Sequence, residues 1–443
     1  MFEHGLTIEL VTMLQAIVDH VIPLRAYVVD NLLKMLQRVL RSYPKGATGN
    51  TETLHLALMT LANFNFSTGH MTPYATFLTF AHDGVLQFLA HPTLAIREAA
   101  CLACAPLLIP PRVAQGDAPP PDSVLGDLDA SDNSRPASVA ALPTASAQRH
   151  RPARTDASLL SWDDIGSSSC SDMIQELESQ MYTISHDEGE TVKEAIRVLL
   201  QRGVSDSCHN IRLSALLSLD EPFLSPYLAD TSLLRLLVTL LHDSYLEVRL
   251  LAMRIVGRLV SHNPSVANPK LMVTASQLLS NIQSTNISRV DDTHNVVIYR
   301  NDSDLQLLAQ LVRSAPTIAS LYVQPILSAV LPRLRVKENT PMVVSRALSV
   351  VGALAHVDPA AVKAHLPEIM PILLVVLKDQ ASILRRRNGF RTLADLSQGV
   401  GYVIEPYRDF PELMAILTDV GFFYFGVEVC LVSLPHLLLL PSG

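Results

Sequence analysis

The sequence predicts an all-α protein in which antiparallel helix pairs stack into one solenoid. Three observations support this prediction. Apolar residues recur at helical spacing along most of the chain, and sustained period-two alternation, which is typical of strands, is nearly absent. In addition, a turn signature of one acidic and one basic residue returns after 37 residues, from Arg212 to Arg249, and after 39, from Arg346 to Arg385. A period of this length is typical of repeats made of two helices.

Composition limits the class of protein further. The chain has 443 residues, of which 49% are hydrophobic, 17% charged and only 5% aromatic, with Trp162 as the single tryptophan. The core is therefore aliphatic, as in packed helices. A net charge of −8 argues against nucleic acid as a partner. Five scattered cysteines and an N-terminus without a signal-peptide pattern favour a reducing, cytoplasmic location.

The first region, residues 1–109, is predicted to consist of HEAT-like helical repeats. Residues 6–40 are interpreted as two antiparallel helices interrupted by Pro23, because a proline removes a helical hydrogen bond. Further helices are expected at residues 53–63, 73–90 and 94–108.

The composition changes at Pro110, and residues 110–171 are rich in Pro, Ala, Ser and Asp. Such a segment buries too little apolar area to offset the entropy lost on ordering, so it is predicted to be a disordered insert. Its serines are candidate phosphorylation sites, and Arg149, Arg151 and Arg154 form a small basic cluster, but a solvated linker is the favoured interpretation.

Helical periodicity returns in residues 172–420, and here the turn signature defines HEAT-like repeats. An aspartate precedes an arginine by six residues in three turns between an apolar helix and the next: Asp206 and Arg212, Asp243 and Arg249, and Asp379 and Arg385. Residues 91–97 have the same spacing, with His91 in the acidic position before Arg97, and residues 339–346 are a looser version.

The chemistry of these residues suggests why they recur. An aspartate just before a helix accepts hydrogen bonds from backbone N–H groups that have no partner within the helix. An arginine one turn further along reaches the carboxylate of the neighbouring repeat. We therefore predict a structural ladder made of Arg97, Asp206, Arg212, Asp243, Arg249, Asp379 and Arg385.

Other motifs favour structural roles. The pair Cys101 and Cys104 forms a C-x-x-C within an apolar helix and lacks the further ligands of a zinc site, so both are interpreted as buried residues. Residues 82–84, 385–387 and 399–401 are interpreted as parts of helices or a helix C-cap. Nucleotide-binding, metalloprotease, hydrolase and kinase motifs are not found, so no catalytic, cofactor-binding or metal-binding residue is predicted.

Several strings resemble the N-terminal HEAT region of the target of rapamycin (TOR) serine/threonine protein kinases. The longest are residues 211–221, residues 247–264 and residues 401–411, which read GYVIEPYRDFP where the family has GYVVEPYRKYP. Shorter pieces at residues 31–36, 96–100 and 311–316 follow the family's order. The resemblance covers most of residues 6–109 and 190–420.

The resemblance implies a cytoplasmic kinase that senses nutrients and growth signals, found in this family also on endomembrane, lysosomal or vacuolar surfaces and in the nucleus. It implies that the solenoid contacts the regulatory subunit of TOR complex one and helps form the TOR dimer. ATP and Mg²⁺ belong to the family's catalytic domain, which this sequence does not include. The chain itself is therefore expected to be a scaffold without enzymatic activity and without a cofactor. The alternative is a standalone HEAT adaptor or transport-type binding protein.

Three segments depart from the family. The insert at 110–171 is longer than the corresponding loop, and residues 290–301 are interpreted as an extra segment within a helical pair. Residues 421–443 form an atypical hydrophobic tail, interpreted as an artefact of the gene model, and the chain is expected to be truncated at both ends. Residues 421–440 are long enough to span a membrane, but Glu428, Pro435 and His436 interrupt them, so a membrane tether is the weaker interpretation.

Overall fold

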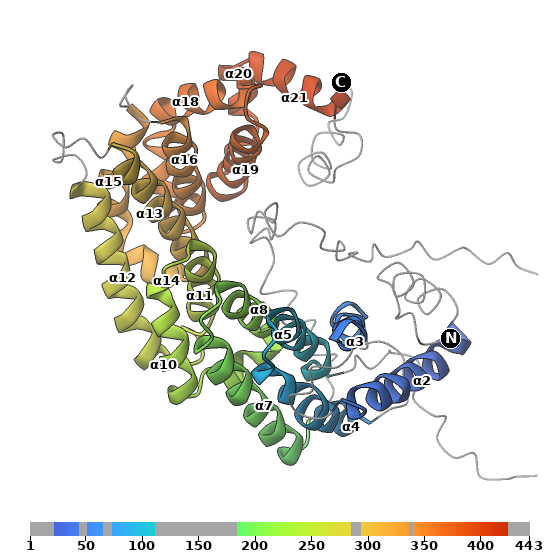
Figure 1. Ribbon diagram of the computed structural model, residues 1–443. Helices are drawn as coiled ribbons and strands as arrows, with labels where there is room; N and C mark the ends of the chain where they lie inside the picture. Colours follow the sequence, from blue (N-terminus) through green and yellow to red (C-terminus); the bar gives the residue numbers. More distant parts are fainter. Residues whose placement is uncertain are drawn as a thin grey trace, which may run out of the picture. The chain divides into compact units, whose positions relative to one another are not determined.

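The computed structural model describes residues 22–43, 51–64, 73–110, 184–284, 294–335 and 340–423 (Figure 1). All regular secondary structure in these ranges is helical, so the predicted all-α fold is confirmed. The chain divides into two compact units, one of residues 1–85 and 106–189 and the other of residues 86–105 and 190–443. The predicted insert lies outside the described residues except for Pro110, and the domain boundaries proposed from composition stay predictions.

In the first unit, helix α2 (Ile22–Arg41) packs against α3 (Thr51–Asn63), and α4 (Tyr74–Phe80) continues into a π-helical turn, η1 (Ala81–Val85). Pro23 lies in the first turn of α2, where its missing N–H costs nothing, so residues 22–41 form one helix. The part of the predicted helical pair before Ile22 lies outside the described residues.

The helix predicted over residues 73–90 changes its winding in the middle. It is α-helical at first, π-helical over η1 and 3₁₀-helical over η2 (Leu86–Ala90). Gly84 lies in the π turn, and a Cβ atom there would come within 2.6 Å of the Phe80 ring. Apolar periodicity does not report such local changes of hydrogen bonding, which is why the sequence predicted one uniform helix.

The second unit contains most of the repeats. Its longer helices are α5 (Leu94–Leu108, of which residues 94–105 belong to this unit), α7 (His186–Val204, from residue 190), α8 (His209–Leu219), α10 (Thr231–Thr239), α11 (Leu246–Arg258), α12 (Pro264–Ser284), α13 (His294–Ser314), α15 (Val323–Arg335), α16 (Pro341–Ala355), α18 (Leu366–Lys378), α19 (Ile383–Val400) and α21 (Glu412–Phe423). Short elements join them: η3 (Pro222–Leu224), α9 (Ser225–Leu228), η4 (Leu240–His242), α14 (Pro316–Ala319), η5 (Ser320–Tyr322), α17 (Pro359–Lys363) and α20 (Glu405–Asp409).

These helices form two rows, which can be followed in Figure 1. In one row α8, α11, α13, α16 and α19 pack successively against one another, and in the other α10, α12 and α15 do so. Each helix of one row also packs on its sequence partner in the other, as α12 does on α13 and α15 on α16. Antiparallel pairs stacked in this way make a HEAT-type solenoid, as the repeat period predicted.

The helices of the first row approach closely because small residues lie between them. A Cβ atom at Gly257 would meet Ser314 of the next helix in the row, and one at Gly399 would meet the backbone of Ala355. Around these contacts the core is aliphatic, with fully buried leucines such as Leu354. Burial of such side chains supplies the main stabilisation of each repeat.

Helix ends follow local sequence signals. Asp230, Thr340, Asp358 and Ser382 each accept a hydrogen bond from a backbone N–H in the first turn of the helix that follows. Helix α19 ends at Gly401, whose φ of 72° is left-handed, so the predicted glycine C-cap is confirmed.

The structure describes part of two segments that were predicted to depart from the family, residues 290–301 and the tail at residues 421–443. From His294 onward, the supposed extra segment at 290–301 forms the beginning of α13, and its being extra relative to the family stays a prediction. The tail is helical up to Phe423, where α21 ends, and residues 424–443 lie outside the described ranges. Within the described ranges no single helix has both the length and the apolar character to cross a membrane, although two sharply bent helix pairs do so in combination.

Candidate functional site

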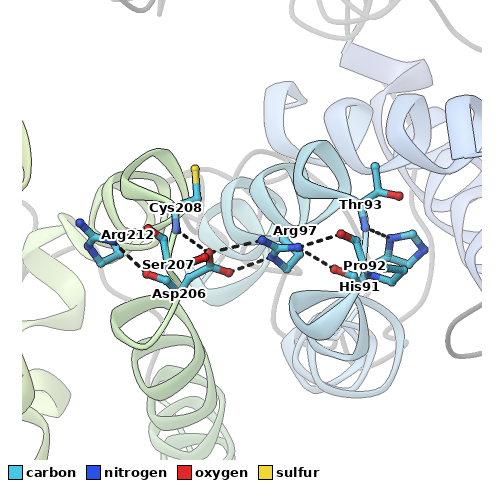
Figure 2. A network of polar contacts seen from close by, with 8 residues as sticks. All are labelled: His91, Pro92, Thr93, Arg97, Asp206, Ser207, Cys208 and Arg212. Atoms are coloured by element: carbon cyan, nitrogen blue, oxygen red, sulfur yellow. Dashed lines mark hydrogen bonds and ion pairs between the residues drawn. The ribbon is translucent and has the colours of Figure 1, made fainter.

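The turns of the repeats carry an ordered network of polar contacts. In each turn the side chain at the first signature position accepts a hydrogen bond from the backbone N–H two residues later. The aspartate bonds are Cys208 N–H to Asp206, Tyr245 N–H to Asp243 and Ala381 N–H to Asp379, each 2.9 Å between N and Oδ1. His91 does the same through Nδ1, which accepts from the Thr93 N–H at 3.1 Å (Figure 2). The first position therefore fixes the turn before the second helix begins.

The arginine of the signature closes the same turn from the other side. Arg212 Nη1 donates to the carbonyl oxygens of Asp206 and Ser207 at 2.9 and 3.2 Å. Arg97 repeats this geometry on His91 and Pro92, at 2.9 and 3.0 Å (Figure 2). The spacing of six residues therefore has a local explanation. It places the arginine guanidinium beside the carbonyl oxygens of its own turn.

The remaining arginine nitrogens reach the next repeat. Arg97 Nε lies 2.8 Å from Asp206 Oδ2, and its Nη2 lies 3.4 Å from Oδ1. Arg212 makes the same paired contact with Asp243, at 2.7 and 2.9 Å. Paired donors on one carboxylate fix its orientation as well as its position. Each arginine therefore ties its own turn to the following one, and we call this chain of contacts the turn ladder.

The pair of Arg212 and Asp243 is the most enclosed part of the ladder, with 11% and 7% of the side chains exposed. Burial raises the pKa of Asp243, but the hydrogen bonds from Arg212 and from the Tyr245 N–H outweigh it, so that the pKa lies below its ordinary value. The hydrogen bond to Asp243 raises the pKa of Arg212. The aromatic ring of Tyr245 lies against Arg212, 5.9 Å from its guanidinium carbon, and stacks on His209 with ring centroids 3.8 Å apart.

The lowered pKa of Asp243 predicts how stability depends on pH. Because the folded-state pKa lies below the unfolded value of about 3.9, the carboxylate stabilises the fold fully above that value and loses this contribution as pH falls through the folded pKa. Asp243→Asn is expected to be less stable than the natural chain at neutral pH, with the gap narrowing below about pH 4. Urea unfolding of both proteins between about pH 7 and pH 3 measures this, and a constant gap would contradict the assignment.

Two predicted members of the ladder behave differently. Arg385 forms an ion pair with Asp379, the acidic residue of its own turn, instead of one from a neighbouring repeat. Arg249 has a buried Nε without a hydrogen-bond partner, and within the described ranges its side chain makes no ion pair, whereas its backbone N–H donates to the Tyr245 carbonyl oxygen at 3.2 Å. The cross-repeat contacts of the ladder, as far as the structure describes them, therefore run from Arg97 to Asp243.

Arg346, the arginine of the looser signature at residues 339–346, also pairs differently from the arginines of the ladder. Arg346 Nε lies 3.4 Å from Asp302 Oδ1, so it bridges α16 and α13 through helix residues and not through turns. Burial raises the pKa of Asp302 although Arg346 opposes the effect. Sequence spacing could not show this pair, because Asp302 lies inside a helix and outside the repeated turn.

A second cluster, which sequence reasoning missed, lies at the C-terminal ends of α8 and α11, whereas the turn ladder lies at their N-terminal ends. Asp220, at the C-cap of α8, is 4% exposed and pairs with both Arg254 and Arg258 of α11, at 2.9 Å for Arg258 Nη1. Arg258 Nε also donates to Ser225 Oγ at 2.9 Å. Burial and then the neighbouring Arg258 lower the pKa of Arg254 to about 10. The repeats of α8 and α11 are thus joined by ion pairs at both ends of these helices.

The thiols of the C-x-x-C are buried in α5. Burial raises the pKa of Cys104 to about 12, and burial followed by Cys104 raises that of Cys101. Both thiols are therefore protonated near neutral pH, whereas thiol exchange needs the thiolate. The described residues contain no cluster of three or more His, Cys, Asp or Glu side chains suited to a metal ion.

Together, the stacked helix pairs and the ladder define the class of protein as a HEAT-type repeat solenoid whose polar sites join repeats. Its sequence relatives are the TOR serine/threonine protein kinases. The chain is 32% identical over 230 residues to the kinase TOR2 of Saccharomyces cerevisiae, 34% over 232 residues to mTor of Drosophila melanogaster and 34% over 235 residues to tor1 of Schizosaccharomyces pombe. Each match covers 52% of this chain and 9% of the relative, so the chain spans about a tenth of their length.

No family model matches the chain. Among solved structures it is similar to yeast importin-β (Kap95p), with 13% identity and a TM-score of 0.43 over 92% of this chain and 43% of that one. A second importin-β structure, from a polyethylene glycol condition, gives a TM-score of 0.45 over 89% of this chain and 45% of that one, also at 13% identity.

Proposed function

We propose that this chain is the N-terminal HEAT-repeat scaffold of a TOR-type serine/threonine protein kinase and assembles protein partners in nutrient and growth signalling. The observation that carries the proposal is the 32–34% identity to TOR kinases from yeasts and fly over about 230 residues. The standalone adaptor is not favoured, because the sequence relatives are these kinases. The proposed location is the cytoplasm, with endomembrane surfaces and the nucleus as further sites of the family.

The ladder supports a scaffold role in a physical sense. A solenoid holds partners at fixed separations only if its repeats keep their relative positions, and each repeat contacts only its neighbours. Arg97 and Arg212 add a directional contact between consecutive turns, beyond the non-directional burial of leucines. The proposed partners are the regulatory subunit of TOR complex one and a second TOR chain.

A binding measurement tests the proposal directly. The purified chain, titrated with the purified regulatory subunit of TOR complex one from the same species, is expected to give saturable binding. An importin-β fragment of similar length serves as the control, since it is similar only at the level of helical repeats. Absence of binding, or equal binding by the importin-β fragment, would show that the proposed scaffold role is wrong.

The proposal assigns catalysis to a kinase domain with ATP and Mg²⁺ outside this sequence. The purified chain with Mg²⁺ and labelled ATP is therefore expected to transfer no phosphate to a protein substrate. Phosphate transfer by the chain alone would contradict that assignment.

A further inference from the structure

The first turn of the ladder differs from the other signature turns in the group that accepts the backbone hydrogen bond. This acceptor is the imidazole of His91, whereas the other turns have the carboxylates of Asp206, Asp243 and Asp379. A carboxylate ordinarily keeps its charge and its acceptor oxygens above about pH 4. Histidine, in contrast, is the side chain that takes up a proton between about pH 8 and pH 5.

The geometry of the turn requires the neutral form of His91. The backbone N–H of Thr93 can only donate, so His91 Nδ1, at 3.1 Å, accepts this hydrogen bond and carries no proton (Figure 2). In a protonated imidazole both ring nitrogens are donors. Protonation of His91 therefore takes the acceptor away from the Thr93 N–H and places two donors against each other.

The surroundings of His91 also oppose a positive charge on its ring. His91 is 4% exposed, so a charged imidazole would lose most of its contact with water. The guanidinium of Arg97 donates to the His91 carbonyl oxygen at 2.9 Å, so the new charge would lie near an existing cation. Two carboxylates belong to the same region, Glu98 of α5 and Asp206, and the second already binds Arg97. The preceding element, η2, contains no charged residue.

We propose that the His91 turn is a proton-sensitive joint of the ladder, closed while the imidazole is neutral and opened when it takes up a proton. In the closed turn, the carbonyl oxygens of His91 and Pro92 hold the guanidinium of Arg97. Opening of the turn releases Arg97 from them and weakens its contact with Asp206. The link between the α5 and α8 repeats therefore loosens in mildly acidic surroundings. This inference goes beyond the proposed scaffold function and does not depend on the assignment to the TOR kinases.

Proton linkage gives the size and the direction of the effect. A histidine in an opened, solvated turn binds its proton near pH 6.5, whereas the closed turn excludes the proton. Because the opened state binds more protons, the closed turn is fully stable above this pH and loses stability as pH falls through it. Between pH 7.5 and pH 5.5, the equilibrium constant for opening is expected to rise about tenfold.

Hydrogen exchange of the full chain at these two pH values, followed by mass spectrometry, tests the proposal. After correction for the intrinsic pH dependence of exchange, peptides that contain residues 91–97 are expected to lose about tenfold in protection at pH 5.5. His91→Asn is expected to abolish the change, because an amide oxygen accepts the same hydrogen bond and does not titrate. His91→Asp gives this turn the aspartate of the other turns and is expected to abolish the change as well.

Peptides that contain residues 379–385 are the internal control, because the acceptor of that turn is a carboxylate. Their protection is expected to be the same at both pH values. Three results would overturn the proposal: unchanged protection of residues 91–97 in the natural chain, the same loss of protection in the two His91 variants, and an equal loss in the control peptides. Circular dichroism at pH 7.5 checks the folding of the variants, and either variant alone is sufficient for the comparison.

Discussion

Asp243→Ala is expected to lower the free energy of unfolding by about 3 kcal/mol, the largest effect of any single change in the turn ladder. The substitution leaves the enclosed guanidinium of Arg212 without its anion and the Tyr245 N–H without its acceptor. Breaking an enclosed pair by removing one partner costs more than the pair itself contributes, because the remaining charge stays desolvated. Urea unfolding followed by circular dichroism measures the change.

The matched control is an ion pair of similar chemistry that is open to solvent. Glu194 and Arg197 of α7 lie 2.9 Å apart with about half of each side chain exposed. Glu194→Ala is expected to change stability by no more than about 0.5 kcal/mol, because exposed pairs are screened by water. In the double variant Asp243→Ala with Arg212→Met, the loss is expected to be smaller than the sum of the two single losses. Equal effects of Asp243→Ala and Glu194→Ala would show that the ladder does not couple repeats.

The ladder also shows which contacts a sequence can predict. Asp206, Arg212 and Asp243 were predictable because they recur at one spacing in one context, and their backbone contacts are local consequences of that spacing. The carboxylate partner of each arginine can be predicted from the sequence only where the repeats stack regularly. In the turn of Asp379 the arginine pairs locally, and nothing in the spacing distinguishes that turn from the others.

Contacts between helices were less accessible to sequence reasoning. Asp220 and the arginines of α11 are 34 and 38 residues apart and belong to no repeated motif, so their pairing depends on how α8 and α11 pack. An arginine pair at helical spacing, Arg254 and Arg258, was the available signal, but it is also typical of a solvated helix face. The helices themselves were predictable, because apolar periodicity is a local property, whereas the π turn at Gly84 depends on one contact with Phe80.

Glycines within the helices are a further case in which a contact between helices could not be predicted from the sequence. One of them, Gly257, is the site of the second large stability effect that we expect. Gly257 lies inside α11, where glycine is less favourable than alanine by about 1 kcal/mol when nothing else intervenes. The structure supplies the reason for its presence. A Cβ atom at this position would lie 2.5 Å from Ser314 Cβ and 2.9 Å from the Ser314 carbonyl carbon on α13. Gly257→Ala is therefore expected to lower the free energy of unfolding by about 2 kcal/mol, despite the better helix propensity of alanine.

Gly389→Ala on α19 is the matched control, because the new Cβ would meet only side-chain methyl groups of Leu377 and Val376, at 3.0 and 3.2 Å. These groups can move by a few tenths of an ångström, so the expected change is within about 1 kcal/mol of zero. In the background of Gly257→Ala, the further change Ser314→Gly removes the colliding side chain and is expected to restore part of the lost stability. The backbone carbon of residue 314 stays, so recovery is expected to be incomplete. Equal effects of the two glycine substitutions would mean that α11 and α13 separate easily, and that close packing in this row is not what fixes neighbouring repeats.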